Sequence, residues 1–217
     1  MASLQRFVPI VVSLVLLGCA SSNPVGQIPN YHADVYPLSE TQAGITIGID
    51  EISSPERAER YFGTDLTREG LVPVYVALSN HGKQRVAVKP SDILLYRGKD
   101  VVDPLPTPYV VATSKRQHQQ LQRTKSDKEL AKFFETVAFK DTVLSPNETY
   151  RGVIFFAAPP RKGAADRLFS ALAVIRDAGS KMRVGVTSVD TGERVRFGPF
   201  PLGARDSAGF VSSSAGN

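Results

Sequence analysis

The side chains that could perform catalysis or hold a metal are few in this chain and lie far apart. Its single cysteine is Cys19, and its three histidines are His32, His81 and His118. A zinc site needs several cysteine, histidine or carboxylate ligands that converge on one point, and the sequence offers no such grouping. We therefore expect no metal and no cofactor, and we expect all three histidines to lie in turns or on the surface.

The triplet Asp190-Thr191-Gly192 matches the catalytic triplet of aspartic proteases, in which two carboxylates share one proton. A single copy would have to form a homodimer to provide the second carboxylate. The triplet also lies between two alternating apolar runs at residues 182–189 and 194–197. Since glycine readily adopts the positive φ that tight turns require, we predict that the triplet is the turn of a β-hairpin.

Other catalytic groups give no recognisable pattern. The Gly-x-Ser-x-Gly sequence that presents a serine nucleophile is missing from the chain. Carboxylates that could serve a hydrolase are scattered, and a facing pair cannot be recognised from spacing alone; they include Asp50, Glu51, Asp65 and Asp100. We expect no enzymatic activity, and a carboxylate-based hydrolase is the alternative.

The most basic segment spans residues 114–132, and its cations are Lys115, Arg116, Arg123, Lys125, Lys128 and Lys132. One interpretation is a surface for an anionic partner such as lipid phosphates, lipopolysaccharide or an acidic protein. The other is a solvated helix face that Asp127 and Glu129 partly neutralise. No aromatic residues alternate with these cations, as base stacking would need, and the net charge is only +5. We therefore expect no nucleic-acid partner.

The N-terminus has the organisation of a secretory signal peptide. Residues 1–6 contain one positive charge, Arg6, and residues 7–17 form an apolar stretch interrupted only by Pro9 and Ser13. A membrane-spanning helix needs about 20 apolar residues, so this stretch is too short to cross a bilayer. A basic start, a short apolar middle and a small residue at its end indicate export and removal of the segment.

The end of this segment, Leu16-Leu17-Gly18-Cys19, resembles the lipobox of bacterial lipoproteins. The resemblance implies cleavage between Gly18 and Cys19, a diacylglyceryl thioether on Cys19, and often an acylated new amino terminus. Leu17 is larger than the residue most often found before the small one. By the rule for enterobacterial lipoproteins, Ala20 and Ser21 after the cysteine imply the outer membrane, with the chain facing the periplasm.

The composition predicts four segments. Residues 1–18 are the signal peptide, and residues 19–40, with three prolines among small and polar residues, are a flexible tether. Residues 41–206 form the folded domain, and the small, polar residues 207–217 are a disordered tail.

The pattern of the folded domain is dominated by strands. In residues 45–49, isoleucines alternate with Thr46 and Gly48, which is typical of a half-buried strand. Pro73 cannot donate a backbone hydrogen bond, so its strand is expected to lie at a sheet edge or to begin beside one. Further runs predict strands at 72–78, 84–88, 93–96, 149–157, 168–175, 182–189 and 194–197.

Two stretches are expected to be helical. Residues 55–62 place proline in a first turn behind Ser53 and Ser54. A second helix begins at Ser126 or Asp127, with apolar residues at helical spacing, inside a helical insertion at about 113–139. Seven or eight strands with these insertions predict a mainly β fold, an immunoglobulin-like antiparallel β-sandwich with one or two short helical insertions.

The stretches "YFGTDL…GLVPVYVALSN" and "LSPNETYRGVIFF" are similar to those of envelope lipoproteins that carry immunoglobulin-like sandwiches of unassigned activity. This resemblance covers about half of the mature chain and implies the fold but no functional residues. Together with the lipobox, it leads us to expect a non-enzymatic binding or assembly module of the cell envelope. We expect it to be held to the membrane by lipid on Cys19 and to bind another envelope protein, with an envelope hydrolase as the alternative.

Overall fold

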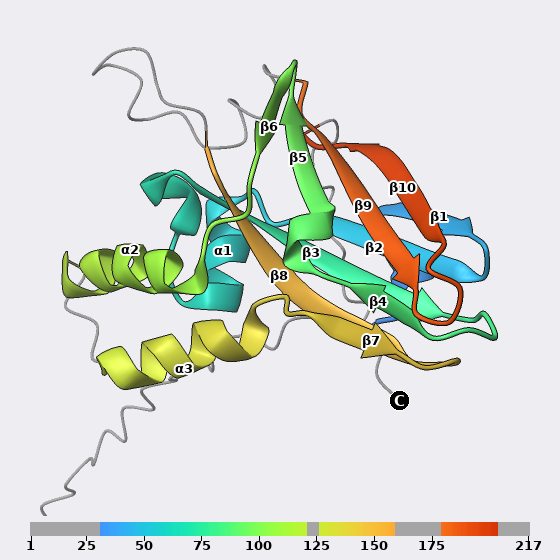
Figure 1. The fold of residues 1–217 in the computed structure, drawn as a ribbon. Coiled ribbons are helices and arrows are strands. Elements are labelled where there is room, and N and C mark those ends of the chain that lie inside the picture. The colour runs from blue at the N-terminus through green and yellow to red at the C-terminus, as the bar shows by residue number, and fades with distance from the viewer. Residues whose placement is uncertain (1–30, 121–125, 159–178, 204–217) are drawn as a thin grey trace, which may run out of the picture.

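The computed structural model describes residues 31–120, 126–158 and 179–203. In this part of the chain, ten β-strands form two antiparallel sheets that face each other, and three α-helices accompany them (Figure 1). The fold is mainly β and sandwich-like, which confirms the fold class predicted from the alternating strands.

The first sheet is centred on β3 (Leu71–Asn80) and is called the β3 sheet below. β3 pairs with β2 (Ile45–Glu51) on one side and with β8 (Thr149–Ala157) on the other, and β1 (Leu38–Gln42) pairs with β2. Every residue of β3 is buried, which requires that both faces of the sheet be covered.

The second sheet is centred on β9 (Lys181–Ser188) and is called the β9 sheet. β10 (Arg194–Pro201) pairs with β9 along one side. On the other side β9 pairs first with β5 (Ile93–Arg97) and then with β4 (Val86–Val88). β6 (Asp100–Val102) extends the sheet beyond β5, and β7 (Thr142–Leu144) extends it beyond β4.

The main hydrophobic core lies between the two sheets. Alternate residues of each strand point into it, such as Ile45, Ile47 and Ile49 of β2, because successive side chains of a strand lie on opposite faces. From the β9 sheet, Met182 and Val184 reach the same core. Burial of a large aliphatic side chain contributes about 1.5–3 kcal/mol to stability. The side chains of this core therefore hold the two sheets packed against each other.

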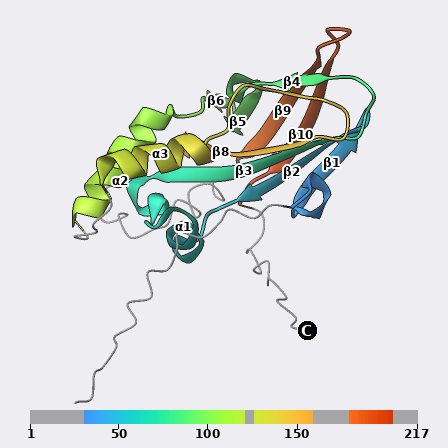
Figure 2. The same cartoon turned by 90° about the horizontal axis from the view of Figure 1, so that it is seen from below.

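A second core lies on the outer face of the β3 sheet. α1 (Pro55–Phe62), α2 (Thr107–Gln120) and α3 (Asp127–Val137) contribute buried side chains to it, together with the outward residues of β3 and β8. The rings of Phe62 and Phe134 lie 6.1 Å apart, and both pack against Phe155 of β8 at 5.8 Å. The helices therefore form a third layer on the sandwich (Figure 2).

Local signals place two of the helices as expected. α1 begins after Ser54, whose Oγ accepts a hydrogen bond from the Arg57 N–H at 3.1 Å, and it ends at Gly63 with φ of 71°. α3 begins after Ser126 with a capping box, in which the Ser126 N–H donates to Glu129 Oε2 at 2.9 Å. The boundaries of α1 and the start of α3 confirm the sequence prediction.

The expected insertion at 113–139 contains two helices, and the first begins earlier, at Thr107. Periodicity missed this helix because part of its buried face is polar. Thr113, Ser114 and Gln117 are all buried, and Gln117 Nε2 donates to the carbonyl of Asp65 at 3.1 Å. Polar contacts such as this hydrogen bond therefore help to hold α2 against the rest of the domain, in addition to its apolar side chains.

Of the two alternatives for Pro73, an edge strand is wrong, because β3 is an inner strand of its sheet. β2 ends at Glu51, which pairs with Val74, so Pro73 lies one residue beyond the ladder on that side. The Pro73 carbonyl accepts from the Ile52 N–H at 3.0 Å. On the other side Pro73 and Phe155 are a non-hydrogen-bonded pair, because the Phe155 carbonyl points away from β3 and accepts from the Leu105 N–H at 2.7 Å. The missing N–H thus removes only one bond, at the end of a ladder.

Part of the expected tether belongs to the folded domain. A short 3-10 helix, η1 (Ala33–Val35), precedes β1, and both Ala33 and Tyr36 are buried. They pack on the outer face of the β3 sheet over Gly48, where a side chain would collide with the Ala33 carbonyl and the Tyr36 ring. Composition alone did not show this, because the contact depends on one glycine in a neighbouring strand.

Three short strands, β1, β6 and β7, were not expected from the sequence. Two further 3-10 turns, η2 (Leu66–Glu69) and η3 (Pro90–Asp92), connect the longer elements. The predicted strand at 168–175 and the predicted tail at 207–217 lie outside the described residues.

Candidate functional site

Three turns that are distant in sequence meet at one end of the sandwich. They join β1 to β2 at Ala43-Gly44, β3 to β4 at residues 81–85, and β9 to β10 at residues 189–193 (Figure 1). The His81 N–H donates to the Gly44 carbonyl at 2.7 Å, and the Val189 N–H donates to the Arg85 carbonyl at 2.9 Å. These backbone bonds fix the three turns around a common opening.

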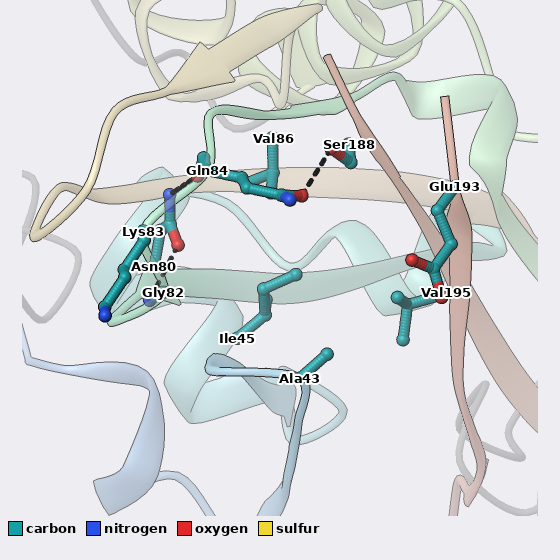
Figure 3. Close-up of a pocket in the computed structure, with 10 residues that line it drawn as sticks. All are labelled: Ala43, Ile45, Asn80, Gly82, Lys83, Gln84, Val86, Ser188, Glu193 and Val195. Atoms are coloured by element: carbon teal, nitrogen blue, oxygen red, sulfur yellow. Dashed lines mark hydrogen bonds between the residues drawn. The ribbon is translucent and has the colours of Figure 1, made fainter. Parts of the chain in front are cut away.

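The opening leads into a cavity of about 320 Å³ between the two sheets (Figure 3). Its apolar lining includes Ile45, Val86 and Val195, which lie at the end of the inter-sheet core. Its polar lining comes from the turns and consists of Asn80, Gly82, Lys83, Gln84, Ser188 and Glu193. Its volume lies at the lower end of the range for small-molecule sites, and its lining mixes apolar side chains with a larger number of polar and charged ones.

Asn80 stabilises the turn on one side of this site. Its Nδ2 donates to the carbonyls of Gln84 at 2.9 Å and Leu144 at 3.2 Å, and its Oδ1 accepts from the Gly82 N–H at 3.0 Å. Both amide hydrogens and the carbonyl oxygen are thus used within the protein. Asn80 shapes the β3–β4 turn rather than offering groups to a ligand.

Gln84 and Ser188 form a second polar pair on the side of the opening that belongs to the β9 sheet, where β4 and β9 are neighbours. Ser188 Oγ donates to Gln84 Oε1 at 2.7 Å and accepts from the Thr191 N–H at 3.2 Å. Among the described residues, Gln84 Nε2 has no acceptor, and it borders the cavity. The site therefore presents an amide donor that a ligand carbonyl or carboxylate could use.

Two opposite charges border the opening. Lys83 and Glu193 lie on opposite sides of the cavity (Figure 3). Both residues are exposed, and neither forms an ion pair with another described residue. The lining therefore combines a cation, an anion, an amide donor and an apolar wall.

Asp190 of the Asp-Thr-Gly triplet holds the hairpin in place instead of facing a second carboxylate. It accepts from the Arg85 N–H at 2.9 Å and from the Arg85 guanidinium at 3.0 Å. These bonds hold the pKa of Asp190 below its ordinary value. Gly192 has φ of 74°, and the triplet lies between β9 and β10, so the prediction of a hairpin turn is confirmed.

The other candidate carboxylates lie apart and have structural contacts. Asp50 pairs with Arg57 of α1, and Glu51 Oε2 accepts from the Gly203 N–H at 2.7 Å. Asp65 Oδ1 accepts from the N–H groups of Thr67 at 3.0 Å and Arg68 at 3.2 Å, at the start of η2. Asp100 is exposed at the first residue of β6. The structure does not bring these four carboxylates together.

The described histidine side chains, His32 and His81, lie on different segments. His32 and His81 are exposed, on a segment before η1 and in the β3–β4 turn, and His118 lies in α2. Within residues 31–120, 126–158 and 179–203, no three histidine, cysteine, aspartate or glutamate side chains gather as metal ligands would.

The predicted basic segment is divided between two helices. Lys115 of α2 forms an ion pair with Asp127 of α3, and Arg116 donates to Thr113 Oγ1 at 3.2 Å. Lys128 and Lys132 are exposed on α3. Arg123 and Lys125 lie outside the described residues, as do Gly18 and Cys19. The interpretation as a solvated helix face therefore fits Lys115 best, since that charge is neutralised locally.

None of the helices in the described ranges is both long and apolar enough to cross a bilayer.

Sequence reasoning missed the cavity residues because they come from three separate turns. No single stretch contains a motif, and Asn80, Gln84 and Ser188 are common turn or strand-end residues. The only signal in the sequence was that small and polar residues gather at the predicted turns. Ordinary loops have the same composition, so this signal does not identify a site.

No protein-family model matches the chain, and no curated protein matches it in sequence. Solved structures that are similar to it at low identity include the following three. One is the "putative lipoprotein (ycdA)" of Bacillus subtilis, with 12% identity and a TM-score of 0.37, covering 77% of this chain and 38% of that one. The YjhA protein of Bacillus subtilis has 8% identity and a TM-score of 0.34, covering 68% of this chain and 95% of that one. A functionally unknown protein of Listeria monocytogenes EGD-e has 12% identity and a TM-score of 0.38, covering 76% and 82%. The chain thus spans less than half the length of the first of these proteins, and no family is assigned by these likenesses.

Proposed function

We propose that this chain is a lipid-anchored lipoprotein of the bacterial envelope whose β-sandwich acts as a non-enzymatic binding module. The anchor is Cys19, freed by cleavage after Gly18, and the domain faces the periplasm from the outer membrane. The support for the anchor is the basic start, the apolar run of residues 7–17 and the lipobox that follows it.

Lipid on Cys19 would keep the domain close to the membrane. Each buried methylene contributes about 0.8 kcal/mol, so two or more acyl chains give stable anchoring where one gives only marginal binding. Tyr31, the first described residue, lies twelve positions after Cys19. Since an extended chain spans at most about 3.6 Å per residue, Tyr31 stays within roughly 43 Å of the lipid.

The observation that carries the binding function is the cavity at the end of the sandwich. It combines the apolar wall of Ile45, Val86 and Val195 with the free amide donor of Gln84 and the charge of Lys83. The carboxylates considered for a hydrolase have structural contacts or lie at a strand end instead. This lining fits a small ligand that has an apolar part and a carbonyl or carboxylate acceptor.

N-acetyl-L-leucine is a suitable probe, because it has a carboxylate for Lys83, an acyl carbonyl for Gln84 and an apolar side chain. We expect saturation transfer from the purified protein to this probe in ligand-observed NMR. Lys83→Met should raise its Kd about threefold to fivefold, since an ion pair with an exposed lysine contributes up to about 1 kcal/mol.

Lys89→Met is the matched control, because Lys89 is an exposed lysine outside the cavity lining. It should leave the Kd unchanged. Saturation transfer that is equal in Lys83→Met and the unchanged protein, or transfer that is missing altogether, would contradict a ligand site in this cavity.

A further inference from the structure

The outward face of the β9 sheet carries a row of positive charges that the sequence analysis did not single out. In β9, Lys181 and Arg183 are exposed while Met182 and Val184 between and beyond them are buried. In β10, Arg194 and Arg196 are exposed while Phe197 is buried. Because strand side chains alternate between faces, these four cations share the face that points away from the inter-sheet core.

Apolar and aromatic side chains lie on the same face. Tyr96 of β5 is opposite Lys181, and Leu94 is opposite Arg183, in the register of β5 with β9. The Arg183 guanidinium lies 5.3 Å from the centroid of the Tyr96 ring. Val101 of β6 is opposite Tyr96 and is 51% exposed. We call Leu94, Tyr96, Val101, Lys181, Arg183 and Arg196 the cationic face.

The charges of this face are largely uncompensated. Arg194 forms an ion pair with Asp92 at 2.6 Å, and its guanidinium lies over Gly185. Asp190 is engaged by Arg85. In the part of the chain that the structure describes, Lys181, Arg183 and Arg196 form no ion pair. Neighbouring positions on paired strands lie about 5–8 Å apart, so three like charges are held close together.

The two outer faces of the sandwich differ in what covers them. α1, α2, α3 and η1 pack on the outer face of the β3 sheet, and their apolar side chains form the second core (Figure 2). No described helix contributes to a core on the outer face of the β9 sheet. The cationic face is therefore the broad sheet surface that the described elements do not cover.

We infer that the cationic face is a docking surface for an acidic surface of a second protein. Arginine and tyrosine are enriched in protein interfaces and among the residues that dominate their binding energy. Here an arginine stacks on a tyrosine beside exposed aliphatic side chains, so the face offers apolar contact together with unpaired positive charge. Complementary charge would steer an acidic partner and fix its orientation.

The position of the tether favours a partner protein over the anchoring bilayer. Arg151 Nε donates to the carbonyl of Tyr31 at 2.9 Å, so the described chain begins on the outer face of the β3 sheet. The cationic face lies on the opposite side of the sandwich. Given the proposed anchor on Cys19, on which this step rests, the tether reaches the domain on the side opposite the cationic face and leaves that face open to a partner.

The test is site-specific photo-crosslinking in intact cells with the full-length protein. A photoreactive residue replaces Val101, which is exposed beside Tyr96, and the adduct is identified by mass spectrometry. The expected result is one recurrent protein adduct whose crosslinked peptide lies beside clustered aspartate or glutamate. The double variant Arg183→Glu and Arg196→Glu should reduce this adduct at least tenfold.

Lys128→Glu with Lys132→Glu is the matched control, because it makes the same change in charge at two exposed lysines of α3. It should leave the adduct unchanged. An adduct that both double variants reduce equally, an adduct with a peptide lacking acidic residues, or no protein adduct would overturn the inference.

A second arm separates a protein partner from a lipid surface. The purified protein is mixed with vesicles containing 30% phosphatidylglycerol, and sedimentation is measured for the unchanged protein and both double variants. Sedimentation lost only in the Arg183→Glu, Arg196→Glu variant would assign the face to lipid and overturn the inference. Acylation of Cys19 is measured separately, so failure of the anchor is distinguishable from failure of the docking surface.

Discussion

Replacing Gly152 by alanine is expected to lower the free energy of unfolding by about 3 kcal/mol, the upper part of the range for overpacked cores. Gly152 lies in β8, and a Cβ built there would be 2.5 Å from Phe139 Cα and 2.8 Å from its backbone nitrogen. No real side chain tolerates contacts of this length with backbone atoms, so either β8 or the segment after α3 must move.

The segment after α3 has little freedom to move. The Phe139 N–H donates to the Val153 carbonyl at 2.9 Å, and Ala138 forms a bridge with Val153. The Phe139 ring is buried between the sheets and packs edge-on against Tyr150 at 5.0 Å. A shift of this segment would therefore disturb both its hydrogen bonds and the core.

Urea denaturation monitored by circular dichroism measures the effect. Gly185→Ala is the matched control, because Gly185 is also a buried strand glycine whose Cβ would approach another group closely, at 2.7 Å. That group is the mobile end of the Arg194 side chain, so we expect a loss below about 1 kcal/mol. Equal losses for the two variants would contradict the packing described for Gly152.

Phe134→Ala is expected to lower the free energy of unfolding by about 4 kcal/mol, as found for large aromatic side chains removed from cores. Phe134 is completely buried and links α3 to α1 through Phe62 and to β8 through Phe155. Its removal would leave a cavity at the centre of the second core, where all three helices meet the β3 sheet.

The neighbouring Phe133 is the control for this prediction, because it has the same side chain but is only half-buried. Phe133→Ala should lower the free energy of unfolding by less than half as much as Phe134→Ala. The same urea titration measures this as a smaller decrease in the midpoint. If the two variants lose equal stability, the helical layer is not held through Phe134 in the way the structure indicates.

Local patterns in the sequence were sufficient to predict most of the regular structure. The alternating isoleucines of β2 and the alternating valines of β3 reflect one face that points into the inter-sheet core. The start of α3 was predictable because Ser126 and Glu129 form a capping box within four residues. In each case the pattern that predicts the element lies within a few residues along the chain.

The features that the sequence did not predict depend on contacts between distant segments. Pro73 is tolerated in a central strand because β2 ends beside it, and Ala33 is buried because Gly48 offers space. The helical layer could not be foreseen as a layer, since its partners Phe155 and Val153 belong to a strand whose other face fills the main core. Such contacts follow from topology rather than from local propensity.

The two candidate surfaces differ in how far the sequence could have revealed them. Arg183 in the predicted strand 182–189 and the alternating Arg194 and Arg196 in the predicted strand 194–197 were within reach of sequence reasoning, whereas Lys181 joins them only because β9 begins one residue earlier than predicted. The sequence analysis instead followed the denser charges of residues 114–132, of which Lys115 is neutralised by Asp127. The end cavity had no such signal, because Ile45, Gln84 and Ser188 meet only in the folded chain.

The proposed function depends most on the lipid anchor, and metabolic labelling with radioactive palmitate tests this anchor directly. Cells expressing the full-length protein or its Cys19→Ser variant are labelled, and the protein is followed through membrane fractionation. We predict that the unchanged protein is labelled and sediments with the outer membrane, and that Cys19→Ser abolishes the label and the size change due to cleavage after Gly18. An unlabelled protein that is processed normally, or label that persists in Cys19→Ser, would contradict the account.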